Sequence, residues 1–115
     1  MQAMNLVDRF RHFLACYARK DLAAISRMLT EGVTLRDWDI SVQGRADVER
    51  ATSDNFASAH SIDIEVLAVY EKADAVAGEL RIVVDGEIEL YVVDVIQFDA
   101  QGQVAAIRSY KGRAD

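Results

Sequence analysis

Proline is absent from this chain of 115 residues, and cysteine occurs only once. A single cysteine cannot form a disulfide within the chain, and it fits the reducing cytoplasm, which is where we expect this protein. No apolar run reaches the roughly 20 residues that a membrane-spanning helix needs. The first residues mix polar and apolar types, which is not typical of a secretory signal. No linker or repeat divides the chain, so residues 1–115 are predicted to form a single domain.

Basic residues are also scarce, with 13 against 19 acidic ones and a net charge of −6. Nucleic-acid binding needs clustered Lys and Arg side chains, so nucleic acid is not an expected partner. The two histidines, His12 and His60, have no second His or Cys at metal-site spacing. No metal and no other cofactor is therefore predicted. Hydrophobic residues make up 51% of the chain, enough to form a folded core.

Helical spacing of apolar residues predicts three helices in the first half of the chain. The first covers residues 3–19. The second covers Leu22–Leu29, with Asp21 as its N-cap and Gly32 as a left-handed stop just beyond it. The third runs from Arg45 to about Ala59. Its apolar face is narrow, so we expect this helix to cover an opening rather than to cross the core.

The remaining segments alternate apolar and polar residues, as strands do. Asp85-Gly86 between two apolar runs is a strong hairpin signal. Helices followed by a mostly antiparallel meander predict an α+β domain, with the helices packed on one face of a curved sheet. The predicted strands are Val33–Trp38, a short one within Asp39–Gln43, Ser61–Glu71, Ala75–Val84, Glu87–Phe98 and Gln103–Lys111.

Two carboxylates fall on the apolar face of their strands. The inward face of Glu87–Phe98 carries five apolar residues and Asp94, and Asp37 shares a face with Val33 and Leu35. An ionised Asp in a buried row is costly unless it is paired or keeps its proton. Each Asp is therefore a partnered structural acid, a sign of a different register, or a working group in a cavity.

The structural alternative has specific partners. Asp37 could pair with Arg36 or Arg45. Asp94 could pair with Arg108, which is predicted to face inward together with Val104 and Ala106. Such a salt bridge would ionise Asp94 and prevent it from donating a hydrogen bond.

The outer face of the sheet is predicted to be apolar as well. Tyr91, Val93 and Val95 lie there on the long strand, and Ala105 and Ile107 on the last one. A strand that is apolar on both faces is covered on both. Because the helices cover only one, a second copy of the chain is predicted to cover the other, giving a two-fold homodimer.

Several motifs follow one another in an order that resembles the nuclear transport factor 2-like superfamily, and within it the ketosteroid isomerase and SnoaL-like polyketide cyclase group. The resemblance covers nearly the whole chain. It implies a cone-shaped, strongly curved sheet with the helices on its concave face, an apolar pocket between them, and a homodimer through the outer face. The motifs are Tyr17-Ala-Arg-Lys-Asp21-Leu, Val33-Thr-Leu-Arg-Asp37-Trp38, Val42-Gln-Gly44-Arg45 and Asp94-Val-Ile-Gln-Phe98-Asp-Ala-Gln-Gly102-Gln-Val-Ala-Ala-Ile-Arg108-Ser-Tyr.

The resemblance also implies roles for the two carboxylates. Asp37, sixteen residues after Asp21, stands where the isomerases have their general base. Asp94, four residues before Phe98, stands where they have an oxyanion-stabilising acid. The chain departs from the isomerases at Phe13, where they carry a tyrosine hydroxyl. Tyr17 lies one turn later on the same helix face.

The predicted function is binding of a small apolar molecule, with carboxylate-mediated proton transfer on a steroid-like or polyketide-like ketone. Asp37 and Asp94 are the predicted catalytic residues. One alternative is a non-catalytic ligand-binding or dimerisation module, and another is a hydrolase or dehydratase that holds a water between Asp37, Asp94 and Arg108. The predicted ligand-binding residues are Phe13, Tyr17, Trp38, Phe56, Val92, Ile96 and Arg108.

Overall fold

A computed structural model describes residues 5–113 as three helices and a six-stranded sheet that does not close. The sheet order is β2-β1-β6-β5-β4-β3, with β1 and β6 parallel and the other pairs antiparallel. The α+β prediction is confirmed. The elements are α1 (Leu6–Ala18), α2 (Leu22–Met28), β1 (Leu29–Arg36), β2 (Ser41–Gln43), α3 (Arg45–Ser58), β3 (Ile62–Lys72), β4 (Ala75–Val84), β5 (Ile88–Phe98) and β6 (Val104–Lys111).

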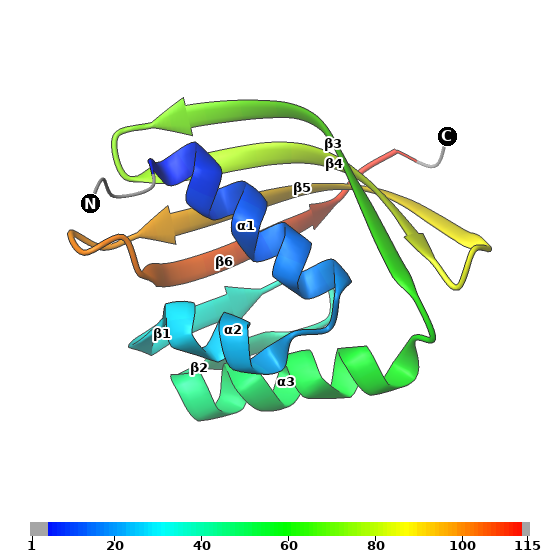
Figure 1. Cartoon of the computed structure of the whole chain (residues 1–115), viewed down its shortest axis with the longest axis horizontal. Helices are drawn as coiled ribbons and strands as arrows, with labels where there is room; N and C mark the ends of the chain where they lie inside the picture. The colour runs from blue at the N-terminus through cyan, green and yellow to red at the C-terminus, as the bar shows by residue number, and fades with distance from the viewer. Residues whose placement is uncertain (1–4, 114–115) are drawn as a thin grey trace.

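The three helices lie on the concave side of the sheet. Figure 1 shows α1 across the long strands, while α2 and α3 lie beside β1 and β2. Among residues 5–113, no helix combines the length and the apolar composition that crossing a membrane would require. Residues 3 and 4 of the predicted first helix lie outside the described residues.

Side-chain caps fix where the first two helices begin. The Asn5 carboxamide accepts a hydrogen bond from the Asp8 amide at 2.8 Å, and the Asp21 carboxylate accepts one from the Ala24 amide at 3.1 Å. Each bond satisfies an amide that has no partner inside its helix. The predicted cap at Asp21 is confirmed, and α1 begins at Leu6, directly after its N-cap Asn5.

Contact between α1 and β4 requires a glycine. The Phe10 ring packs so closely on β4 that a Cβ at Gly78 would lie 2.5 Å from it. Phe10 and the neighbouring Leu80 are both almost fully buried. The helix therefore lies directly on the sheet backbone at this point.

The prediction that the chain turns at Gly32 is wrong. Strand β1 begins at Leu29, and Gly32 lies inside it without a left-handed backbone. Leu29 is fully buried and pairs with Val104 of β6, and the register then shifts before Thr34. Burial of Leu29 in the sheet overrides the local helix-stop signal.

The predicted hairpin at Asp85-Gly86 is confirmed. Both residues have left-handed backbones, with φ of 57° and 69°. This conformation suits a tight turn between twisted antiparallel strands. The turn sets the register between β4 and β5, in which Gly78 lies opposite Asp94.

An irregularity in β3 turns its last residues outward. The β3–β4 register shifts between Val66 and Ala68. In an uninterrupted strand Tyr70 would share the face of Ile62 and Ile64, but it lies on the outer face, where its hydroxyl donates a 2.5 Å hydrogen bond to Glu79. One extra residue in a strand is enough to reverse the faces of all the residues that follow it.

A second irregularity, between β5 and β6, has the same effect near the carboxylates. Gln97 pairs with Ala106, but Phe98 pairs with Val104, so Ala105 is the extra residue. Beyond it, Ile107 and Ser109 face inward and Arg108 faces outward. The predictions that Arg108 faces inward and that Ile107 faces outward are therefore wrong.

Candidate functional site

A cavity of about 380 Å³ lies between the helices and the concave face of the sheet. This volume is in the range of small-molecule sites. Most of its lining side chains are apolar, and none of the described residues that line it is Lys, Arg or His. The polar lining residues are Tyr17, Asp37, Thr52, Asn55, Ser58, Asp85, Asp94 and Ser109.

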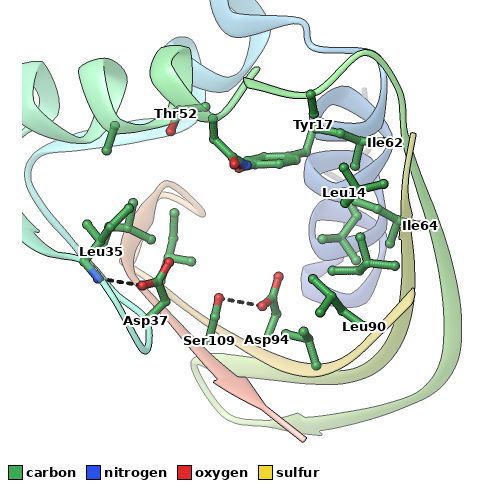
Figure 2. A pocket seen from close by; sticks show the side chains of 18 of the residues that line it. Leu14, Tyr17, Leu35, Asp37, Thr52, Ile62, Ile64, Leu90, Asp94 and Ser109 are labelled. Atoms are coloured by element: carbon green, nitrogen blue, oxygen red, sulfur yellow. Dashed lines mark hydrogen bonds between the residues drawn. The ribbon is translucent and has the colours of Figure 1, made fainter. Parts of the chain in front are cut away.

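Asp94 projects into this cavity from the middle of β5. Its register partner on β6 is Ser109, whose hydroxyl donates a 2.6 Å hydrogen bond to Asp94 Oδ1 (Figure 2). Burial raises the pKa of Asp94 to about 6, the Ser109 hydrogen bond opposes this rise, and the charge of Asp37 adds to it. An acid that titrates near neutral pH can exchange a proton with a ligand under physiological conditions.

Asp37 enters the cavity from the turn that follows β1. Its Oδ1 accepts hydrogen bonds from the amides of Asp39 and Ile40, both at 2.7 Å. Asp commonly makes such bonds to amides two or three residues ahead, which stabilises a tight turn. The turn holds this carboxylate in a fixed orientation, and Figure 2 shows it directed into the same space as the Asp94 carboxylate.

Tyr17 of α1 lies on the opposite wall of the cavity (Figure 2). Its ring packs edge-on against Phe56, with centroids 4.8 Å apart, and Asn55 Nδ2 donates a 2.5 Å hydrogen bond to its hydroxyl. Burial raises the pKa of Tyr17, the Asn55 hydrogen bond lowers it, and the charges of Asp94 and Asp37 raise it further. The hydroxyl is thus within electrostatic reach of both carboxylates.

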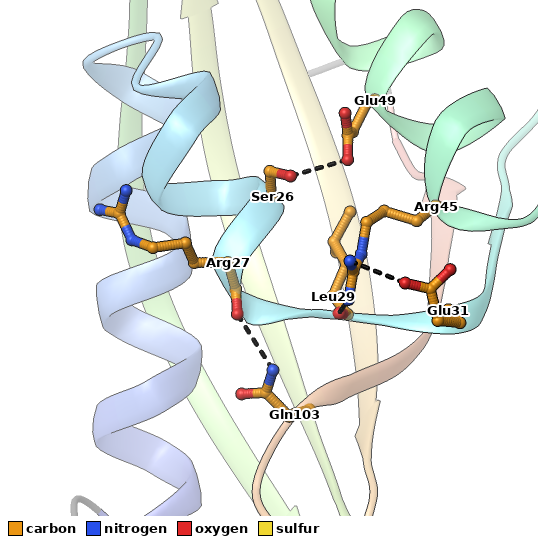
Figure 3. A network of polar contacts seen from close by, with 7 residues as sticks. All are labelled: Ser26, Arg27, Leu29, Glu31, Arg45, Glu49 and Gln103. Atoms are coloured by element: carbon orange, nitrogen blue, oxygen red, sulfur yellow. Dashed lines mark hydrogen bonds and ion pairs between the residues drawn. The ribbon is translucent and has the colours of Figure 1, made fainter.

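Helix α3, which carries Asn55, is fastened at its first turn (Figure 3). The Arg45 guanidinium donates to the Leu29 carbonyl at 2.8 Å and forms an ion pair with Glu31 at 2.8 Å. The Ser26 hydroxyl of α2 donates to the Glu49 carboxylate at 2.7 Å. These contacts fix the position of α3 over the cavity.

The far end of α3 is held as well. Lys20, in the turn after α1, donates from Nζ to the Ala59 carbonyl and, at 3.1 Å, to the His60 carbonyl. Carbonyls at the end of a helix have no partner within the helix, and a cation is favourable there. The cation at this end of α3 is therefore the Lys20 ammonium, which comes from the turn after α1.

Six of the nine predicted site residues line the cavity, and three do not. Ile96 is fully buried in the core, because the inward row of β5 passes under α1 beyond Asp94. Phe56 is buried behind the Tyr17 ring rather than facing the cavity. Arg108 lies on the outer face. The six that line the cavity are Phe13, Tyr17, Asp37, Trp38, Val92 and Asp94.

Among residues 5–113, neither Asp37 nor Asp94 forms the ion pair that was predicted for it. Arg108 lies opposite Val95 in the ladder and donates to Gln97 at 3.4 Å, so the salt bridge to Asp94 is wrong. Arg45 pairs with Glu31, and Arg36 donates to Ser41 at 2.7 Å, so neither is the partner of Asp37. The alternative in which Asp37, Asp94 and Arg108 together hold a water is also wrong, because Arg108 faces outward.

Sequence reasoning missed Asn55, Ser109 and Asp85. Asn55 lies three residues after Thr52 on α3, so helical spacing could have indicated its inward position. Ser109 appeared to face outward because nothing in the sequence marks the extra residue before it. Asp85 lines the cavity at the hairpin turn, where hydrogen bonds from the Ser61 and His60 amides lower its pKa.

Comparison with solved structures finds the same fold at low sequence identity. An NTF2-like protein of unknown function from Cytophaga hutchinsonii is 13% identical, with a TM-score of 0.81 over 96% of this chain and 93% of that one. A Kribbella flavida protein, provisionally described as a ketosteroid isomerase, is 16% identical, with a TM-score of 0.79 over 91% and 76%. An M. tuberculosis LEH-like epoxide hydrolase is 14% identical, with a TM-score of 0.72 over 87% and 77%.

At these identities the solved structures establish the fold and not the reaction. Comparison with curated proteins gives no match. The sequence profile of the SnoaL-like domain matches residues 10–107, which is most of the chain. The chain therefore belongs to the SnoaL-like family of NTF2-like proteins.

Proposed function

We propose that this protein binds a flat, mostly apolar ketone, steroid-like or polyketide-like, and moves a proton on it in the manner of an isomerase or cyclase. The observation that carries the proposal is the convergence of Asp37 and Asp94 in one apolar cavity whose described lining contains no cationic side chain. A cation between them would hold both acids ionised, whereas an apolar cavity lets the two differ in protonation.

The two acids have surroundings suited to different roles. Asp37 has one oxygen fixed by two amides, which leaves Oδ2 to take a proton from the carbon next to the ketone. Asp94 has a pKa raised to about 6, and a ligand that excludes water from the cavity favours its protonated form further. Protonated Asp94 can donate a hydrogen bond to the ketone oxygen as negative charge develops there.

The proposed reaction uses only side chains of the cavity and needs no cofactor. The C–H electron pair becomes the carbon–carbon double bond of an enolate while Asp37 holds the proton. Asp94 and the Tyr17 hydroxyl stabilise the enolate oxygen. In a β,γ-unsaturated ketone the enolate is conjugated with the second double bond, so Asp37 can return the proton to the γ-carbon and the product is the α,β-unsaturated isomer. A ring closure would use the same enolate as its carbon nucleophile.

The first experiment is a ligand screen that uses Trp38. It is the only tryptophan, and it lines the cavity although 46% of it is exposed. Filling the cavity should shift its fluorescence to shorter wavelength and raise the melting temperature. The screen covers steroids, aromatic polyketides and terpenoids, and Trp38→Phe serves as the control that removes the optical signal but retains the thermal one.

The results of this screen distinguish proton transfer from ligand binding without catalysis. Binding with deuterium exchange at the carbon next to the ketone supports proton transfer. Binding without exchange supports a non-catalytic ligand-binding module. If no compound class changes either signal, the proposed small-molecule function is contradicted.

A further inference from the structure

The Tyr17 hydroxyl has one hydrogen-bond partner among residues 5–113, the Asn55 carboxamide. Asn55 Nδ2 donates at 2.5 Å, so the phenolic oxygen is the acceptor. A tyrosine hydroxyl also carries a hydrogen of its own. That hydrogen has no acceptor among the described side chains and is free for a molecule in the cavity.

The ring that carries this hydroxyl is held from two sides. Phe56 packs edge-on against it at 4.8 Å, and Phe13, one turn earlier on α1, lies 6.4 Å away between ring centroids. These contacts fix the ring plane, but they do not decide where the hydroxyl hydrogen points. A donor on the α3 side of the oxygen directs that hydrogen away from α3.

We propose that Asn55 is a positioning residue, which donates to the Tyr17 oxygen and thereby directs the Tyr17 hydrogen toward the oxygen of a bound ketone. The inference rests on the proposed function and adds to it a residue that touches no reacting atom. It also assigns Tyr17 the part that Phe13 is unable to play.

Contacts at both ends of α3 restrict the position of Asn55. Arg45 ties the first turn of α3 to β1, and Lys20 ties its end to the turn after α1. Asn55 lies between these two ties and reaches across to α1. A donor on a helix held at both ends keeps a narrower range of positions than one on a free loop.

The electrostatics agree with the geometry. Burial raises the pKa of Tyr17, and the charges of Asp94 and Asp37 raise it further, which makes its hydroxyl a weaker donor, whereas the Asn55 hydrogen bond lowers that pKa. Asn55 thus offsets part of the effect of the two acids that the proposed reaction needs.

The test compares a ketone with its hydrocarbon counterpart. The ketone oxygen of 2-acetylnaphthalene can only accept, and 2-isopropenylnaphthalene has nearly the same shape without oxygen. Asn55→Ala should weaken ketone binding about three- to tenfold, the range of one neutral hydrogen bond, and leave hydrocarbon binding unchanged. Ser53→Ala is the matched control, because Ser53 lies on the exposed face of the same helix.

Two further variants separate positioning from direct contact. In a Tyr17→Phe background, Asn55→Ala should have no further effect on ketone binding, because Asn55 acts through the hydroxyl. Asn55→Asp can only accept, so it takes up the Tyr17 hydrogen and should weaken ketone binding more than Asn55→Ala does. Wild-type ketone binding in Asn55→Asp, or an equal effect of Asn55→Ala with and without the Tyr17 hydroxyl, would overturn the inference.

A measurement without ligand keeps the inference separate from the proposed function. Carbon-13 NMR of labelled tyrosine, assigned with Tyr17→Phe, reports the titration of Tyr17 directly. Asn55→Ala should raise the Tyr17 pKa, and Asn55→Asp should raise it more. If neither naphthalene probe binds wild type, the titration decides alone: a raised Tyr17 pKa in Asn55→Ala supports the Asn55 contact, and an unchanged one overturns it.

Discussion

Ser109 donates a 2.6 Å hydrogen bond to Asp94 across the pairing of β5 and β6. The acid in the floor of the cavity is therefore held by a hydroxyl and not by a guanidinium. A hydroxyl supports both the neutral and the charged carboxyl, since it can donate and accept. Asp94 can consequently gain and lose a proton while it keeps its hydrogen bond to Ser109.

Replacing Asp94 by Asn should stabilise the protein at neutral pH. The folded-state pKa of about 6 lies above the reference value of 3.8, so between these values the folded state binds more protons than the unfolded one. Stability then falls as pH rises through this window, and the penalty is complete above it. Asp94→Asn removes the ionisable group, and with it this loss of stability.

We expect Asp94→Asn to raise the unfolding free energy by about 1–3 kcal/mol near pH 7.5, after allowance for partial exposure, and by little near pH 4. Urea unfolding at both pH values measures this difference. Asp63→Asn, at an exposed site on β3, should show no such pH dependence. A loss of about 3–5 kcal/mol would instead indicate a broken buried ion pair.

Replacing Asp37 by Asn should stop proton transfer and leave the fold intact. The Asn oxygen still accepts from the amides of Asp39 and Ile40, so the turn is preserved, but a carboxamide is not a base. Deuterium exchange into the bound ketone should fall about a hundred- to ten-thousand-fold. Asp39→Asn, whose side chain is exposed in the same turn, should keep the wild-type rate. Unchanged exchange in Asp37→Asn would show that another group is the base.

Replacing Arg45 by Met should loosen α3. The Leu29 carbonyl would lose its donor and Glu31 its partner, and we expect a loss of about 1–3 kcal/mol in denaturant unfolding. Arg50→Met is the matched control on the same helix, because Arg50 and Asp47 form an exposed pair at 3.1 Å. That control should change stability by less than about 1 kcal/mol. Equal effects of the two variants would mean that Arg45 does not anchor the helix.

The homodimer remains a prediction, and it concerns the outer face of the sheet. Val93, Val95 and Tyr110 lie there, and no helix among residues 5–113 covers them. Light scattering at micromolar concentration should give twice the monomer mass for wild type. Val95→Asp places a charge in the proposed interface and should give a folded monomer. A wild-type monomer at these concentrations contradicts the prediction.

The sequence by itself determined the helices, the hairpin at Asp85-Gly86 and the inward direction of Asp94. These features depend on local periodicity and turn chemistry, which a few neighbouring residues specify. The turn at Asp37 also follows from its own side chain and the next three residues. The α+β class followed from the order of these elements.

Only the tertiary structure decided which residues meet around the cavity. One extra residue at Ala105 reversed the faces of Arg108 and Ser109, and nothing local in the sequence marks that residue. Leu29 joined the sheet because burial outweighed the helix-stop signal after it. Asn55 meets Tyr17 across a separation of 38 residues in the sequence, because α3 packs beside the end of α1. Contacts between distant segments depend on packing and register, and these are set by the whole chain at once.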